Sequence, residues 1–229
     1  DEDFTEGLNA KNWTATKDVE GGSTQGIVDF IIRYEDLVGN PGDAITSVTA
    51  GGGKVTVDRN APTITKADIF SNNDNGDHLA VPGNTIKLKV ETNENIQQPT
   101  ISIATHELDP ADVVIGDGDD AKIWTATWTM TESDDNGVVA FAILFSDSAG
   151  NAGADHSAIT DDEDGLNVTF SKTEPVLTNV EFESDNTAHT NYANTESLLT
   201  LSFDSVEELI ANTVVITINE RDLDPTKTK

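Results

Sequence analysis

The stretch that decides the fold occurs twice in the chain. Residues 137–153 read GVVAFAILFSDSAGNAG, and residues 26–42 read GIVDFIIRYEDLVGNPG, with no gap between the two copies. Trp124 follows Trp13 by the same offset that separates these two stretches. A period of about a hundred residues is that of one globular domain and is too long for a solenoid unit. The sequence therefore predicts a tandem array of one domain.

Comparison of the two copies indicates which side of this strand faces the core. Both copies carry large apolar side chains at alternate positions, which are Val139, Phe141, Ile143 and Phe145 in one copy and Val28, Phe30, Ile32 and Tyr34 in the other. The positions between them vary, since Ala140 and Leu144 match Asp29 and Arg33. Side chains alternate between the two faces of a strand. We therefore expect a half-buried antiparallel strand whose first set points inward.

A tight turn is predicted directly after this strand in each copy. Residues 147–151 read DSAGN, and residues 36–40 read DLVGN. An Asp side chain can accept hydrogen bonds from nearby backbone N–H groups, and Gly can adopt a positive φ. We therefore interpret Asp147 and Asp36 as turn residues and not as catalytic carboxylates.

The composition excludes several classes of partner. The 229 residues include 42 acidic and 13 basic side chains and no Cys, for a net charge of -29. Such an acidic surface repels nucleic-acid phosphates and anionic lipids, so we expect no nucleic-acid partner. The longest apolar run, residues 138–145, is too short for membrane insertion. The absence of Cys excludes disulfides and is compatible with an extracellular protein, whose export signal we expect outside this sequence.

The repeat predicts one complete domain, residues 62–174, between two half domains. Residues 1–61 match its second half, and residues 175–229 match its first half. Short segments rich in Val, Ile, Thr and aromatic residues alternate with Asp-, Asn- and Gly-rich loops, which indicates an all-β chain of tandem immunoglobulin-like β-sandwiches. The complete copy is expected to have strands at residues 64–70, 85–91, 99–104, 123–130, 138–145 and 167–170.

The two half domains are complementary. Strands are expected at residues 13–16, 27–34 and 54–58 in the first half, and at residues 199–203 and 213–216 in the last, where residues 213–216 are aligned with residues 100–103. A half sandwich exposes an apolar face and strand edges. We expect residues 175–229 of one copy to complete residues 1–61 of another, or both halves to be completed by chain outside this sequence. An arbitrary cut from a longer polypeptide is the alternative.

Several motifs of the chain resemble those of a known family. They are NAPTIT at residues 60–65, SNNDN at 71–75, TIKLKV at 85–90, WTATWT at 124–129 and FSDSAGNAG at 145–153. Together they resemble the bacterial Ig-like repeats that occur in tandem in very large surface proteins. The resemblance covers residues 62–174 in full and both flanks in part. It implies an extracellular structural role and, in some members, calcium at domain junctions.

Four acidic loops offer the hard oxygen ligands that calcium prefers, at residues 74–77, 117–120, 134–136 and 161–164. None of them matches an EF-hand loop, and solvated charge is the simpler interpretation. Asp147 and Glu94, in contrast, have acidic counterparts in the other copies. In an immunoglobulin-like topology their loops lie at the end that receives the preceding domain. We therefore predict a junction calcium held by Glu94, Asp147 and Asp58.

We expect no catalytic site in this chain. Its histidines, which are His78, His106, His156 and His189, lie in expected loops at spacings that match no metal or triad pattern, so we interpret them as surface residues. Trp13 and Trp124 fall on the inward side of their strands and are expected in the core. Trp128 matches Lys17 and is expected at the edge of the core.

These observations predict a non-catalytic structural repeat at the cell surface. It would act as a spacer or building block of an adhesin, a surface layer or a filament, with neighbouring copies of the same repeat as partners. The alternatives are a module that binds glycans or ice, and an accessory domain of a secreted hydrolase. An exposed row of aromatics, or a regular Thr array on one flat sheet, would favour the glycan or ice alternative.

Overall fold

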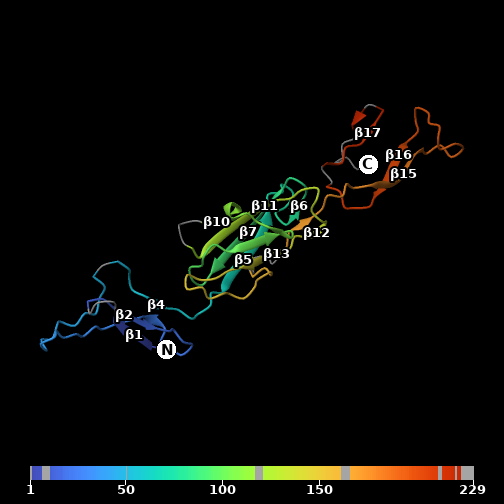
Figure 1. Cartoon of the computed structure of the whole chain (residues 1–229). Helices are drawn as coiled ribbons and strands as arrows, with labels where there is room; N and C mark the ends of the chain where they lie inside the picture. The colour runs from blue at the N-terminus through green and yellow to red at the C-terminus, as the bar shows by residue number, and fades with distance from the viewer. Residues whose placement is uncertain are drawn as a thin grey trace. The chain divides into compact units, whose positions relative to one another are not determined.

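The computed structural model describes residues 2–6, 11–49, 51–116, 121–160, 166–210, 213–219 and 221–222. They fall into two compact units, Asp1–Ser171 and Lys172–Lys229, which are taken separately below. Both consist mainly of strands and loops, and residues 51–116 include one short 3-10 turn, Pro110–Asp112 (Figure 1). The predicted all-β class is confirmed. No helix of the described residues has the length and apolar character needed to cross a membrane.

The central copy, defined here as residues 62–171, has a sandwich-like fold. Its strands are β5 (Ile64–Ser71), β6 (Leu79–Ala80), β7 (Thr85–Thr92), β8 (Thr100–Ile103), β9 (His106–Glu107), β10 (Val113–Ile115), β11 (Ile123–Thr129), β12 (Gly137–Val138), β13 (Phe141–Leu144) and β14 (Thr169–Phe170). One antiparallel sheet has the order β10-β11-β7-β5, which Figure 1 shows side by side. The others have the orders β13-β8-β9 and β12-β14-β6, and β14 runs parallel to β6.

Side chains from all of these sheets form one hydrophobic core. Ile69, Leu88, Ile101, Ile143 and Phe170 are completely buried within a single cluster. The core follows from the alternation of the strands, because every second residue of β7 is buried. The predicted inward set of β13 and its flanks is confirmed, since all four members, Val139, Phe141, Ile143 and Phe145, are buried. Trp124 is buried as predicted.

The first part of the chain has short strands and an open apolar face. It contains the antiparallel pairs β1 (Glu2–Glu6) with β2 (Trp13–Lys17) and β3 (Gly26–Ile27) with β4 (Thr56–Val57). The strand predicted over residues 27–34 is reduced to β3 and a bridge between Ile32 and Ile45. The prediction that this face is buried is wrong, because it exposes between 42% and 52% of each of its four apolar residues, which are Val28, Phe30, Ile32 and Tyr34.

The exposure of this face has a physical cause. In the central copy, the equivalent side chains belong to one buried cluster with side chains of β7 and β8, and residues 11–49 and 51–61 include no counterpart of these two strands. The prediction that Trp13 is a core residue is wrong for the same reason. Trp13 is 52% exposed, whereas its counterpart Trp124, which lies opposite Val90 of β7, is 5% exposed.

The second unit contains two antiparallel strand pairs, β15 (Leu177–Ser184) with β16 (Leu199–Ser205) and β17 (Thr217–Ile218) with β18 (Arg221–Asp222). The strand predicted at residues 199–203 is confirmed by β16, but the strand predicted at residues 213–216 is wrong, because the strand lies at β17.

The pairing of β17 shows how the repeat continues in this unit. Thr217 and Ile218 pair with Asp222 and Arg221 in the same way as Ser102 and Ile103 pair with Glu107 and His106 in the central copy. Thr217 is therefore the counterpart of Ser102, and the loop between β16 and β17 is longer than the sequence alignment assumed. Ile216 is accordingly the counterpart of Ile101.

The hydrogen bonds of the central copy recur in both flanking parts. The Val139 N–H donates to the carbonyl of Val168, and Val28 donates to Val55, at 2.8 Å in both copies. The hydroxyl of Ser71 donates to the carbonyl of Leu79, and its counterpart Ser184 donates in the same way to Tyr192. The sequence repeat is thus also a repeat of local backbone structure.

Candidate metal centre

Three carboxylates predicted to lie together do so. Asp58 follows β4, Glu94 follows β7 and Asp147 follows β13, and one carboxylate oxygen from each lies within 4.8 Å of the other two. This is the one group of potential metal ligands found among the described residues. Asp147 is buried, and Asp58 and Glu94 are half-buried. The fold brings together residues that are far apart in the sequence, in the way the repeat comparison predicted.

Asp147 is fixed by the turn that the sequence predicted. Its Oδ1 accepts the N–H groups of Ala149 at 2.8 Å and Asn151 at 2.9 Å, and its Oδ2 accepts the side-chain amide of Asn151 at 2.7 Å. Gly150 has φ = 94°, a conformation that Gly adopts without strain. Asp36 makes the same contacts with Val38 and Asn40. The turn is therefore a property of the repeat, with or without a metal.

The hydrogen bonds keep the Asp147 side chain ionised. Burial by itself would raise the pKa of this carboxyl group, but the hydrogen bonds from Asn151 and Ala149 stabilise the charged form more strongly. Together they hold the pKa of Asp147 below its ordinary value of 3.8. A buried carboxylate that is charged at neutral pH is therefore available in the triad.

Asp58 is held by contacts from both sides of the predicted domain junction. Its Oδ1 accepts the N–H of Asn60 at 3.0 Å and the side-chain amide of Gln25 at 3.3 Å. Its backbone carbonyl accepts the side-chain amide of Asn151 at 3.2 Å. Asn151 thus contacts two of the three acidic residues, because the same amide group also donates to Asp147.

The triad lines a cavity with further oxygen atoms. The cavity has a volume of about 390 Å³ and is lined by Lys54, Thr56, Asp58, Glu94, Asn95, Asp147, Ser148 and Ala149. An ion that binds oxygen at about 2.3–2.6 Å can touch two oxygens that are up to about 5 Å apart. The spacing of the three carboxylates therefore fits a calcium ion. Lys54 also lines the cavity and is a competing source of positive charge.

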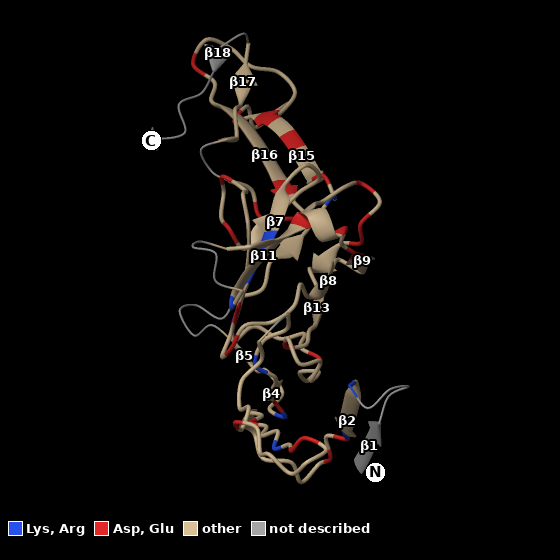
Figure 2. Ribbon diagram, turned by 60° about the vertical axis from the view of Figure 1, so that its left-hand side comes forward, with Lys and Arg blue, Asp and Glu red and all other residues tan. Residues whose placement is uncertain are grey.

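The acidic character of the chain bears on this site. Figure 2 shows acidic residues along strands and loops of both units, with few basic residues between them. Three carboxylates within 4.8 Å repel one another unless a cation lies near them. Of the other acidic loops, residues 117–120 and 161–164 lie outside the described residues.

Asp134, in the third acidic loop, has a different role. Its buried side chain accepts a hydrogen bond from the Thr131 N–H at 2.7 Å and pairs with His106 Nε2 at 2.7 Å. The His106 ring also stacks on Trp128, with centroids 4.3 Å apart. The prediction that His106 lies in a loop is wrong, since it belongs to β9. Trp128 packs against the core as a half-buried residue, as predicted.

Sequence reasoning missed the pair of His106 and Asp134 for a clear reason. The two residues are 28 positions apart, and neither lies in a recognisable motif. Their meeting depends on the turn between β8 and β9, where Ala104 and Thr105 adopt φ values of 50° and 71°. No sequence signal in this chain marks those two non-glycine residues for positive φ.

Comparison with known proteins adds no assignment to this site. No protein-family model, curated protein or solved structure matches the chain.

The two buried aspartates predict a stability that depends on pH. Burial would raise the pKa of Asp134, but the hydrogen bonds from Thr131 and His106 lower it below 3.8, as in Asp147. A carboxyl group whose pKa is lower in the folded state stabilises the fold above pH 3.8 and loses this contribution as the pH falls through the folded-state pKa. Urea denaturation should therefore show a free energy of unfolding that decreases from pH 5 towards pH 2. In an Asp147→Asn variant, the free energy of unfolding should decrease less steeply over this pH range. An unchanged slope would contradict a lowered pKa of Asp147 in the folded state.

Proposed function

We propose that the chain is a non-catalytic structural repeat of an extracellular or cell-surface protein, acting as a spacer or as a building block of an adhesin, surface layer or filament. The observation that carries this proposal is that each flanking part repeats strand pairs of the central copy. The pair β3-β4 repeats β12-β14, whereas β15-β16 and β17-β18 repeat β5-β7 and β8-β9. Tandem repetition of one domain extends a polypeptide and gives it a regular surface. Such repetition does not by itself add a catalytic group to any copy.

The topology of the central copy supports an immunoglobulin-like assignment. An immunoglobulin constant domain has four strands in the order ABED facing the strands CFG. If β5, β7 and β8 are strands A, B and C, then β10 and β11 are D and E, and β13 and β14 are F and G. The order β10-β11-β7-β5 then reads DEBA, and β13 pairs with β8 as F pairs with C.

Calcium at the triad would serve this structural role. Asp58 belongs to the segment that joins the first part of the chain to the central copy, whereas Glu94 and Asp147 belong to the central copy itself. An ion bound by all three would therefore restrict the junction. We propose calcium because the ligands are carboxylates, which prefer hard cations, and because their spacing suits its radius.

The sheet surface gives little support to the glycan or ice alternative, because its row of Thr side chains does not extend regularly to the neighbouring strand. Thr125, Thr127 and Thr129 lie along one side of β11. Their neighbours on β7 are Lys89, Lys87 and Thr85, so two lysines interrupt the array at the next strand.

Extension of single molecules tests the spacer function. When the chain is pulled from its two ends in an atomic force microscope, the central copy should resist and then unfold in one event. Its release should lengthen the chain by roughly 35 nm, as expected for about a hundred residues at about 3.3–3.6 Å each. Extension with no discrete event would contradict a repeat that bears tension. Turnover of a substrate by the purified chain would contradict the non-catalytic assignment.

A further inference from the structure

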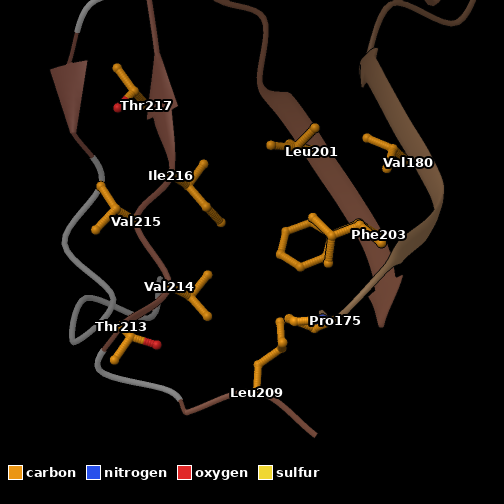
Figure 3. A pocket seen from close by; sticks show the side chains of 11 residues that line it. Pro175, Val180, Leu201, Phe203, Leu209, Thr213, Val214, Val215, Ile216 and Thr217 are labelled. Carbon is orange, nitrogen blue, oxygen red and sulfur yellow. The ribbon is translucent and has the colours of Figure 1, made fainter. Parts of the chain in front are cut away.

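The second unit has an open apolar groove between its strands. The groove has a volume of about 520 Å³ and is lined by Pro175, Leu177, Val180, Leu201, Phe203, Leu209, Val214 and Ile216, among others. Figure 3 shows Leu201 and Phe203 of β16 on one side of this space and Val214 and Ile216 on the other. Val180 and Leu177, on β15, are 59% and 48% exposed.

The central copy shows what covers such a groove. The residues equivalent to Leu201, Phe203 and Ile216 are Leu88, Val90 and Ile101, and all three are completely buried in the central copy. Their cross-strand neighbours lie in the second half of the domain. Ala126 and Trp124 of β11 pair with Leu88 and Val90, and Ile143 of β13 pairs with Ile101.

The side chains that would cover the groove are present in the first part of the chain. Trp13, Phe30 and Ile32 are the repeat counterparts of Trp124, Phe141 and Ile143. They are 52%, 42% and 52% exposed, whereas their counterparts are 5%, 6% and 0% exposed. One chain therefore carries an open groove and an open apolar face that are equivalent to two halves of a domain that it also contains intact.

We propose that residues 11–57 of one copy of this chain bind the groove of a second copy and complete a sandwich of the same kind as the central copy. The register follows from the central copy. Trp13 would lie opposite Phe203 and Ala15 opposite Leu201, as Trp124 and Ala126 lie opposite Val90 and Leu88. Ile32 would lie opposite Ile216, as Ile143 lies opposite Ile101.

The topology of the central copy favours a second copy as the occupant over the same chain. The segment from Asp58 enters at the Ile64 end of β5. The chain leaves at Ser171, whose N–H donates to the carbonyl of Ala80, beside the Ser71 end of β5. A strand of this length spans about 26 Å. The chain thus enters and leaves the central copy near opposite ends of β5.

The proposed contact is heterologous, because it joins the groove of one copy to the apolar face of another. Two copies therefore do not form a closed dimer through it. Each copy would keep one free groove or one free apolar face after binding one partner. Such head-to-tail association builds an open chain of copies. The proposal rests on the repeat architecture proposed above, but its test is separate, because extension of the central copy does not depend on association.

The experiment uses two complementary variants of the 229-residue chain. Ile32→Asp places a charge on the apolar face, and Ile216→Asp places one in the groove. Analytical ultracentrifugation should show a sedimentation coefficient that rises with concentration for the native chain, and a monomer for either variant alone. An equimolar mixture of the variants should give a dimer and nothing larger, because only one groove and one face remain intact. The controls Arg33→Asp and Ser202→Asp alter exposed positions on the opposite faces and should still associate.

A disulfide trap tests the register, since the chain has no Cys. Thr14 should lie opposite Ser202, as Thr125 lies opposite Lys89. Thr14→Cys on one copy and Ser202→Cys on another should form a mixed disulfide on oxidation. Thr14→Cys with Glu181→Cys should not, because Glu181 lies on β15, on the other side of β16.

The outcomes separate the occupants. A monomer at every concentration would overturn the proposal and indicate that other chain completes the halves. A variant with both Thr14→Cys and Ser202→Cys that closes its disulfide within one monomer would overturn it in favour of closure by the same chain. Neither result would affect the extension experiment on the central copy.

Discussion

Replacement of Ile143 by Ala should lower the free energy of unfolding of the central copy by about 2–5 kcal/mol, the range for truncation of a buried Ile. The loss has two sources. Ile143 is completely buried in the core, so the variant loses the transfer free energy of the removed methyl and methylene groups. The tightly paired strands β13 and β8 also limit the collapse of the cavity that the substitution leaves.

The chain supplies a matched control for this variant. Ile32 occupies the equivalent position in the preceding copy and is 52% exposed. Ile32→Ala should change the free energy of unfolding by less than about 0.5 kcal/mol, as at other exposed positions. Urea denaturation measures both variants at concentrations where the chain is monomeric. Equal losses would mean that the face bearing Ile32 is covered in the monomer.

Calcium should raise the melting temperature of the central copy, and a chelator should reverse the effect. Sites of extracellular modules have dissociation constants of about 0.1–1 mM, so about 10 mM calcium should stabilise the fold by about 1–3 kcal/mol. Each kcal/mol corresponds to roughly 4 °C for a domain of this size. Scanning calorimetry measures the shift. The physical cause is the relief of repulsion among Asp58, Glu94 and Asp147.

Two controls separate binding from screening of the net charge of -29. Glu94→Gln should abolish most of the shift, whereas Asp135→Asn, which neutralises an exposed acidic residue outside the triad, should leave it intact. Sodium chloride at matched ionic strength should not reproduce it. A melting temperature that calcium leaves unchanged would contradict the metal centre.

The repeat made both the core and the candidate site predictable. Because two copies could be compared, the alternation around Ile143 separated buried from exposed positions without a structure. The same comparison picked out Asp147 and Glu94 as acidic positions with acidic counterparts, and with Asp58 these three carboxylates lie together. The alternation of apolar residues and the recurrence of acidic positions between copies can both be read from one sequence.

The features that could not be predicted depend on tertiary context. Phe30 is exposed because residues 11–49 and 51–61 include no counterpart of the strands that cover Phe141 in the central copy. The predicted alternation of faces was therefore correct, and the predicted burial of Phe30 was wrong. The strand at Thr217 was predicted at the wrong residues. An alignment error of an even number of positions leaves the alternation of faces unchanged, so the sequence pattern could not reveal the error. His106 and Asp134 meet through an unusual turn that no motif marks.

The parallel pairing of β6 with β14 should influence how the central copy responds to tension. The N–H groups of Thr169 and Ser171 donate to the carbonyls of His78 and Ala80, next to the point where the chain leaves the domain. When the two ends are drawn apart, parallel neighbours slide along each other. Their hydrogen bonds are then sheared together and do not unzip one after another. We therefore expect the hydrogen bonds between β6 and β14 to break in one step, so that this short parallel pair resists unfolding under tension.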